Sequence, residues 1–111
     1  MAVYKSSASG GDALNLSRVV PTGKTYQLVS VSVNLNAAPT TAGNLTITLD
    51  ADAGPECDTL LYSLDLAAGG TTDVFWWPDQ PTYVWGGDAV TVAYANPNSK
   101  TYGAQITVRE A

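Results

Sequence analysis

The chain has 111 residues, of which ten are acidic and five basic, so that its formal net charge is −5, and 45% of its residues are apolar. This length suits one domain with a single hydrophobic core, and the apolar content excludes a disordered chain. No apolar run approaches the roughly 18 residues of a membrane-spanning helix. Residues 1–5 lack the apolar block of a signal peptide, so we expect a protein that is made without export.

The basic residues are scattered along the sequence, whereas a nucleic-acid site needs a basic patch that displaces counterions from the phosphates. We therefore expect neither a nucleic-acid nor a membrane partner. Cys57 is the only cysteine and the chain has no histidine. These counts exclude an internal disulfide and leave Cys57 without a histidine that would activate it as a nucleophile. No cofactor is expected.

The first elements follow from composition and alternation. Residues 1–12 are rich in serine and glycine and bury little, so we expect an extended N-terminal arm, either mobile or laid on a neighbour. In residues 13–20, apolar and polar side chains alternate, which predicts a strand that ends at the turn 21–24.

The next strand contains a change of phase. Its apolar set begins at Tyr26 and Leu28 and then continues from Val29 at every second residue to Leu35. A shift of one residue exchanges the two faces of a strand, so the sequence predicts a β-bulge near Leu28–Val29.

Alternation with a period of two continues to the end of the chain. The clearest half-buried strand covers residues 44–50. In the following run, Leu60 and Tyr62 are expected to share the core-facing side, with Leu61 on the opposite face. Further strands are predicted at residues 71–77, 82–85, 90–94 and 102–108.

The strand count defines the fold class. About eight short strands separated by turn residues, with no stretch of helical period, predict an all-β protein. We expect an antiparallel β-sandwich of jelly-roll type without significant helix. Because no repeat or change of composition follows the arm, residues 13–111 are expected to form a single β-sandwich domain.

An acidic loop raises the question of a metal. Its carboxylates could supply the oxygen ligands that calcium prefers, and they belong to Asp50, Asp52, Glu56 and Asp58. The spacing departs from that of a calcium loop, because Gly54 comes early, Pro55 follows it, and no glutamate stands six residues after a central glycine. We favour a solvated loop, with calcium as the weaker candidate.

Catalysis is not indicated. The acidic residues other than Asp65 lie beside turns, where solubility alone would place them, instead of forming the pair that a glycosidase needs. The sequence also lacks a serine nucleophile elbow and a glycine-rich phosphate loop. We therefore expect a protein that is not an enzyme.

The aromatic stretch 74–85 contains all three tryptophans, the only phenylalanine and one of the six tyrosines. Strand alternation sends Phe75 and Trp77 to the face opposite Trp76, so at least one tryptophan points away from the main core. Such a ring must be covered by a loop, by a ligand such as a sugar, or by another subunit. We expect a ring of the stretch 75–85 at a subunit contact or under the N-terminal arm. The interface candidates are Tyr4, Phe75, Trp76, Trp77, Tyr83 and Trp85.

Over most of residues 25–108 the chain resembles small β-sandwich structural proteins of tailed bacteriophages and prophages. The resemblance lies in the segments 44–50, 58–66, 77–81, 87–88 and 102–103. It implies a non-enzymatic virion component assembled in the host cytoplasm, first of all a capsid decoration or cement protein. The implied partners are the major capsid protein or other virion proteins and further copies of the chain, as a dimer or trimer. The alternative is a tail or fibre module that binds a host glycan through the stretch 75–85, with Trp76 or Trp85 and Tyr83 as a stacking platform.

Overall fold

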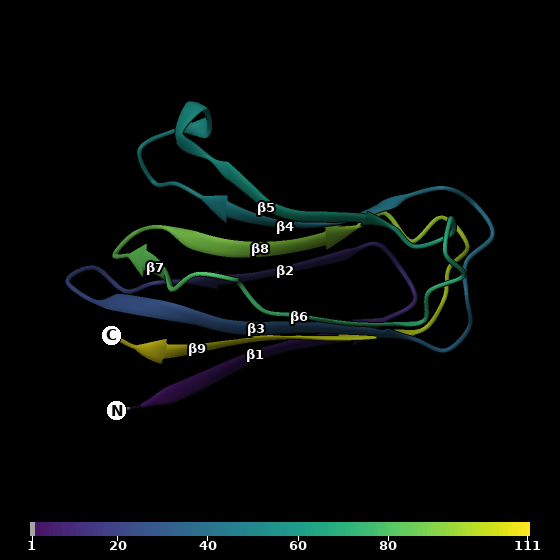
Figure 1. The fold of residues 1–111 in the computed structure, drawn as a ribbon, viewed down its shortest axis with the longest axis horizontal. Coiled ribbons are helices and arrows are strands. Elements are labelled where there is room, and N and C mark those ends of the chain that lie inside the picture. Colours follow the sequence, from purple (N-terminus) through teal and green to yellow (C-terminus); the bar gives the residue numbers. More distant parts are fainter. Residues whose placement is uncertain (1) are drawn as a thin grey trace.

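In the computed structural model, which describes residues 2–111, the chain folds into two antiparallel β-sheets packed face to face (Figure 1). The predicted β-sandwich is thus confirmed. The one helical element in the described residues is a 3-10 turn of three residues, η1 (Pro55–Cys57). The strands are β1 (Val3–Gly10), β2 (Leu14–Val19), β3 (Thr25–Leu35), β4 (Asn44–Asp50), β5 (Thr59–Asp65), β6 (Asp73–Trp76), β7 (Thr82–Trp85), β8 (Ala89–Tyr94) and β9 (Tyr102–Glu110).

The strand order is that of a jelly roll. Sheet A has the order β1-β9-β3-β6, with β7 also paired to β3, and sheet B has the order β2-β8-β4-β5. β7 pairs with the first part of β3 and β6 with the last part, so the two short strands share one edge of β3. Counted as one interrupted strand, they reduce the nine strands to the eight positions of a jelly roll.

The segment expected as an N-terminal arm is an edge strand of sheet A. β1 pairs with β9 from Val3 opposite Arg109 to Gly10 opposite Tyr102. Its small side chains give little apolar alternation, so the strand depends on its main-chain pairing with β9 and on Tyr4, which packs against the core. The segment therefore belongs to the sandwich, and both termini lie at the same end of the molecule (Figure 1).

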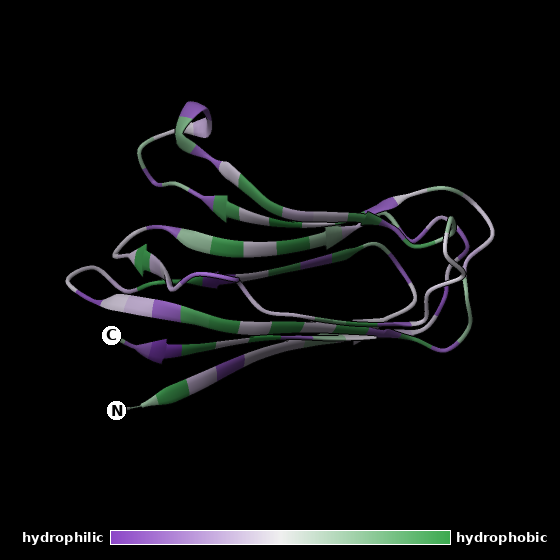
Figure 2. Ribbon diagram, viewed as in Figure 1, coloured by the Kyte–Doolittle hydropathy of each residue, from purple (hydrophilic) through white to green (hydrophobic). Residues whose placement is uncertain are grey.

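The core lies between the two sheets. Apolar and polar residues alternate along the strands (Figure 2), and the apolar ones point into the space between the layers. The largest fully buried side chains include Tyr94, Leu14, Leu28, Leu45, Ile47, Leu66 and Ile106. The alternation that predicted the strands is thus the pattern that fills the core.

The predicted bulge in β3 is confirmed. The pairing with β9 passes from Leu28 opposite Val108 to Ser30 opposite Thr107, which leaves Val29 as the extra residue. Leu28 and Val31 are consequently both buried although they lie three positions apart, while Val29 is 37% exposed.

A second bulge corrects the expectation for residues 60–62. The pairing of β4 with β5 passes from Ile47 opposite Tyr62 to Thr48 opposite Leu60, so Leu61 is the extra residue. Leu61 packs against the core and Leu60 is 60% exposed. Leu60 and Tyr62 do not share a face, because a bulge between them inverts the alternation.

Candidate binding surface

The aromatic surface begins where β6 leaves the core. Val74 is buried, whereas Phe75 is 64% exposed and Trp77, just after the strand, is 59% exposed. The two exposed rings contact each other with centroids 5.5 Å apart. Strand alternation thus sends these two rings to the outer face of sheet A, as predicted.

β7 continues this surface along the same edge. Val84 faces the core, and its neighbours Tyr83 and Trp85 are 46% and 63% exposed. We call the four exposed side chains Phe75, Trp77, Tyr83 and Trp85 the aromatic row. Its strand residues lie opposite β3 positions from Thr25 to Ser32, and a strand rises about 3.3 Å per residue, so the row is roughly 20 Å long.

The other two interface candidates lie elsewhere. Trp76 is half-buried and packs against the core beside Tyr62, with ring centroids 5.8 Å apart. Tyr4 stacks on Tyr26 at a centroid distance of 5.4 Å. The Tyr4 hydroxyl donates to Glu110 Oε1 at 2.8 Å, and this hydrogen bond is the main cause that raises the pKa of Tyr4. Both rings are therefore part of the fold's own packing.

The chain itself leaves the aromatic row uncovered. β1 lies at the edge of sheet A opposite to β6 and β7, with β9 and β3 in between. Of the two covers expected for a ring of the stretch 75–85, a subunit contact or the N-terminal arm, the arm does not apply to residues 2–12, because β1 pairs with β9 instead. Cover by another subunit remains a proposal.

A hollow adjoins Trp77 on the outer face. It has a volume of about 310 Å³ and lies between the bulge of β3, the end of β9 and the segment 77–81. Its polar walls come from Gln27, Asp79, Gln80 and Arg109. Arg109 donates to Gln27 Oε1 from Nε at 3.0 Å and from Nη2 at 2.8 Å, which holds both side chains in place.

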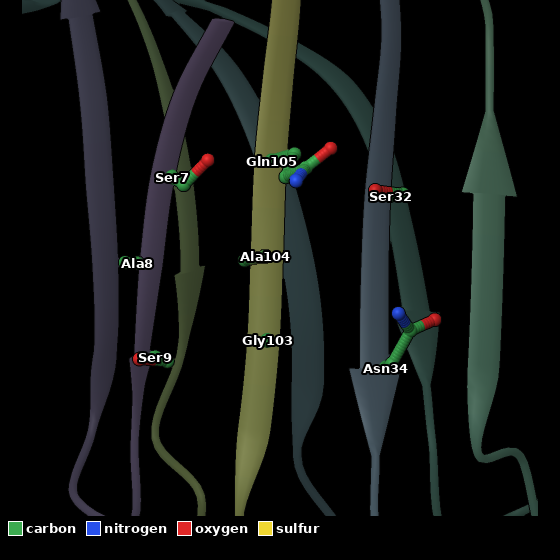
Figure 3. Close-up of a pocket in the computed structure, with 8 residues that line it drawn as sticks. All are labelled: Ser7, Ala8, Ser9, Ser32, Asn34, Gly103, Ala104 and Gln105. Carbon is green, nitrogen blue, oxygen red and sulfur yellow. The ribbon is translucent and has the colours of Figure 1, made fainter.

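A second, polar depression of about 460 Å³ lies farther along the same face, over β1, β9 and β3 (Figure 3). Small side chains form its floor, and the side chains of Ser7, Gln105 and Asn34 stand out from the sheet around it (Figure 3). Ser32 connects this depression to the aromatic row, because it lies opposite Gln105 on one side and opposite Phe75 on the other.

The acidic loop is organised by its own hydrogen bonds. Asp58 Oδ1 accepts the N–H of Ala51 at 2.8 Å, and Asp88 Oδ1 accepts the N–H of Asp52 at 2.9 Å. Within residues 2–111 no three Asp, Glu, Cys or His side chains form a group that could hold a metal. The structure therefore does not bring the calcium candidates Asp50, Asp52, Glu56 and Asp58 together as a ligand set.

Sequence reasoning found the four rings of the row but missed the polar side chains beside it. Gln27 and Arg109 stand 82 positions apart and become neighbours only through the pairing of β3 with β9. Each follows or precedes a buried residue of its strand, Val108 and Leu28, and so points outward. No local sequence pattern could show that Gln27 and Arg109 lie beside the aromatic row.

The fold and this surface define a small all-β two-sheet sandwich with one exposed aromatic row. No protein-family model matches the chain, and no curated protein matches it at a significant level. None of the helices in the described part of the chain is long and apolar enough to cross a membrane.

Proposed function

We propose that this protein is a non-enzymatic structural component of a tailed-phage virion, a decoration or cement protein that binds the outside of the head. It is assembled in the host cytoplasm and binds the major capsid protein or another virion protein. The resemblance of residues 25–108 to small phage β-sandwich proteins suggests this setting. The observation that carries the proposal is the aromatic row.

The row has the character of a protein-binding surface. Isolated apolar side chains on a surface need no explanation, but four exposed rings along one sheet edge, two of them in contact, are typical of an interaction site. Aromatic residues are enriched at the centres of protein interfaces and account for many of their hot spots. Three of the four rings stand on strands of the sandwich and Trp77 directly follows β6, so little conformational entropy is lost when a partner covers them.

The proposal includes further copies of the chain. Head lattices have symmetry axes, and a decoration protein that sits on such an axis forms a dimer or trimer around it. In that arrangement the row contacts the capsid or a neighbouring copy. The net charge of −5 favours solubility before assembly and suits the outer surface of a head, away from packaged DNA.

Binding to purified expanded heads tests the proposal. We expect saturable binding with a fixed number of copies per head, measured by cosedimentation. Trp85→Ala removes a hot-spot ring and should weaken binding roughly 30-fold, which corresponds to about 2 kcal/mol. The matched control is Leu60→Ala, which removes a side chain of similar exposure from sheet B and should bind like the wild type.

Two results would contradict the proposal. If the protein sediments with tails and free of heads, it is a tail or fibre module. If Trp85→Ala and Leu60→Ala bind heads equally well, the aromatic row is not the contact surface.

A further inference from the structure

We propose that the hollow beside Trp77 is a saccharide-binding site in which the Trp77 ring is the stacking platform. The site goes beyond the proposed function and does not depend on it, because it requires no virion partner.

The hollow has the size and composition of a small ligand site. Its volume of about 310 Å³ lies at the lower end of the roughly 300–1,000 Å³ of ligand pockets, which suits one or two sugar rings. Its lining combines the exposed indole of Trp77 and other apolar side chains with the polar side chains of Gln27, Asp79, Gln80 and Arg109. A sugar has the same mixed character, since its C–H face is apolar and its edge carries hydroxyl groups.

The polar side chains of the hollow have hydrogen-bonding groups that are free to bind hydroxyl groups. The two hydrogen bonds from Arg109 to Gln27 use two of the five guanidinium N–H groups and only the oxygen of the amide. Further donors of both side chains therefore remain for a ligand. Asp79 and Gln80 line the same hollow and add acceptors. Planar polar groups of this kind bind paired hydroxyls with two hydrogen bonds at once.

The surroundings favour a neutral saccharide over other ligands. One arginine and one aspartate line the hollow, so it offers no excess positive charge for a phosphate group. A peptide that adds to a sheet edge needs free main-chain N–H groups. Pro78 and Pro81 stand in this wall and have none. Ring stacking and side-chain hydrogen bonds are the interactions left.

A longer oligosaccharide could extend from the hollow beside Trp77 along the outer face of sheet A. Trp77 and Asp79 also line a smaller hollow of about 190 Å³, together with Phe75 and Trp76, so the two hollows share these residues. From Phe75 the path crosses its neighbour Ser32 into the polar depression, where serine hydroxyls and the amides of Gln105 and Asn34 are exposed (Figure 3). Affinity should therefore rise with chain length until this path is filled.

The test begins with the purified wild-type protein on an array of immobilised bacterial surface polysaccharides and their oligosaccharides. Titration calorimetry with the best-bound oligosaccharide then compares variants. Trp77→Ala should weaken binding roughly 30-fold, or about 2 kcal/mol. Arg109→Lys keeps the charge but removes the planar group and should weaken binding roughly 10-fold. Trp85→Ala is the matched control, an equally exposed tryptophan outside the hollow, and should bind within about twofold of the wild type.

Three results would overturn the inference. The first is that the wild type retains no saccharide at millimolar concentration. The second is that Trp77→Ala binds as tightly as the wild type, and the third is that Trp77→Ala and Trp85→Ala lose the same affinity. Thermal melting confirms that each variant is folded. Because Trp85→Ala tests the head contact and Trp77→Ala the saccharide, the proposed function and this inference can fail separately.

Discussion

At the scale of single residues, two buried polar side chains differ in how well their hydrogen-bonding groups are satisfied. Asn96 is 4% exposed, and its amide nitrogen donates to the carbonyl oxygens of Gly11, Asp12 and Lys100 at 3.1, 2.9 and 2.8 Å. It thereby ties the β1–β2 connection to the turn before β9. The Tyr94 hydroxyl is buried in the core and has no hydrogen-bond partner among the described residues.

Tyr94→Phe should therefore stabilise the protein. The change removes a buried hydroxyl that costs free energy and leaves the ring packing intact, so we expect the free energy of unfolding in urea to rise by about 1 kcal/mol. Tyr102→Phe is the matched control, because the Tyr102 hydroxyl donates to the Ala13 carbonyl oxygen at 3.4 Å. That control should lose stability. A loss in Tyr94→Phe as large as in Tyr102→Phe would show that the Tyr94 hydroxyl is satisfied.

Tyr94→Phe should also change how the stability of the protein depends on pH in the alkaline range. Burial, and to a lesser degree the nearby Asp65 carboxylate, raises the pKa of Tyr94 above the usual 10.0. Because the raised pKa belongs to the folded state, the folded protein keeps the Tyr94 proton at a pH where the unfolded chain has begun to lose it. The free energy of unfolding is therefore unaffected by this group below the ordinary tyrosine pKa and falls as the pH rises from there through the folded-state pKa. Above about pH 10 the wild type should therefore lose melting temperature more steeply than Tyr94→Phe.

At the scale of elements, the bulge in β3 lies between the stretches that pair with its two short edge partners, β7 and β6. The part of β3 before Val29 pairs with β7 and the part after it pairs with β6. Leu28 and Val31 lie three positions apart and would face opposite sides of a regular strand, but the extra residue Val29 lets both of them face the core. The bulge also places Val29 in the wall of the hollow beside Trp77.

Deletion of Val29 is expected to be tolerated. It would leave Leu28 directly before Ser30, which continues a regular alternation with Val31 still facing the core. We expect a loss below about 2 kcal/mol in thermal or urea unfolding. Deletion of Ser32 is the matched control, because it turns buried side chains of β3 outward and should prevent folding. If both deletions unfold the protein, Val29 is needed for more than its register.

The elements show where sequence reasoning succeeds and where it stops. The strands of the core and the bulge at Val29 follow from local alternation, which is why they were predictable. The bulge at Leu61 was missed because consecutive apolar residues at 60–62 fit either face equally well. β1 was missed because its partner β9 lies at the other end of the chain and its own side chains are small.

At the scale of the whole molecule, the first and last strands lie next to each other at one edge of the sandwich. β1 pairs with β9, Tyr4 stacks on Tyr26, and the guanidinium of Arg18 lies 5.1 Å from the centre of the Tyr4 ring. The N-terminal segment thus connects sheet A with β2 of sheet B. Residues 3–10 should therefore contribute to the free energy of unfolding, which a mobile arm would not do.

Removal of residues 1–10 tests this role. An arm could be removed without effect, but the loss of β1 uncovers β9 and the Tyr26 ring. We expect a loss of about 3–5 kcal/mol in urea unfolding, a large share of the roughly 5–15 kcal/mol of a typical domain. Removal of residues 1–2 alone is the control and should have little effect. Equal stability of the two truncated proteins would show that β1 is dispensable.

The interrupted edge of sheet A has one more consequence, which concerns self-association. A continuous edge strand rich in exposed aromatic side chains is a template on which other chains add and fibrils grow. Here the edge is divided between β6 and β7, and Pro78 and Pro81 stand in the gap between them. Proline donates no main-chain hydrogen bond, and a broken strand offers an incoming chain no continuous register. The same segment that leaves the rings exposed therefore keeps them from serving as a continuous template for aggregation.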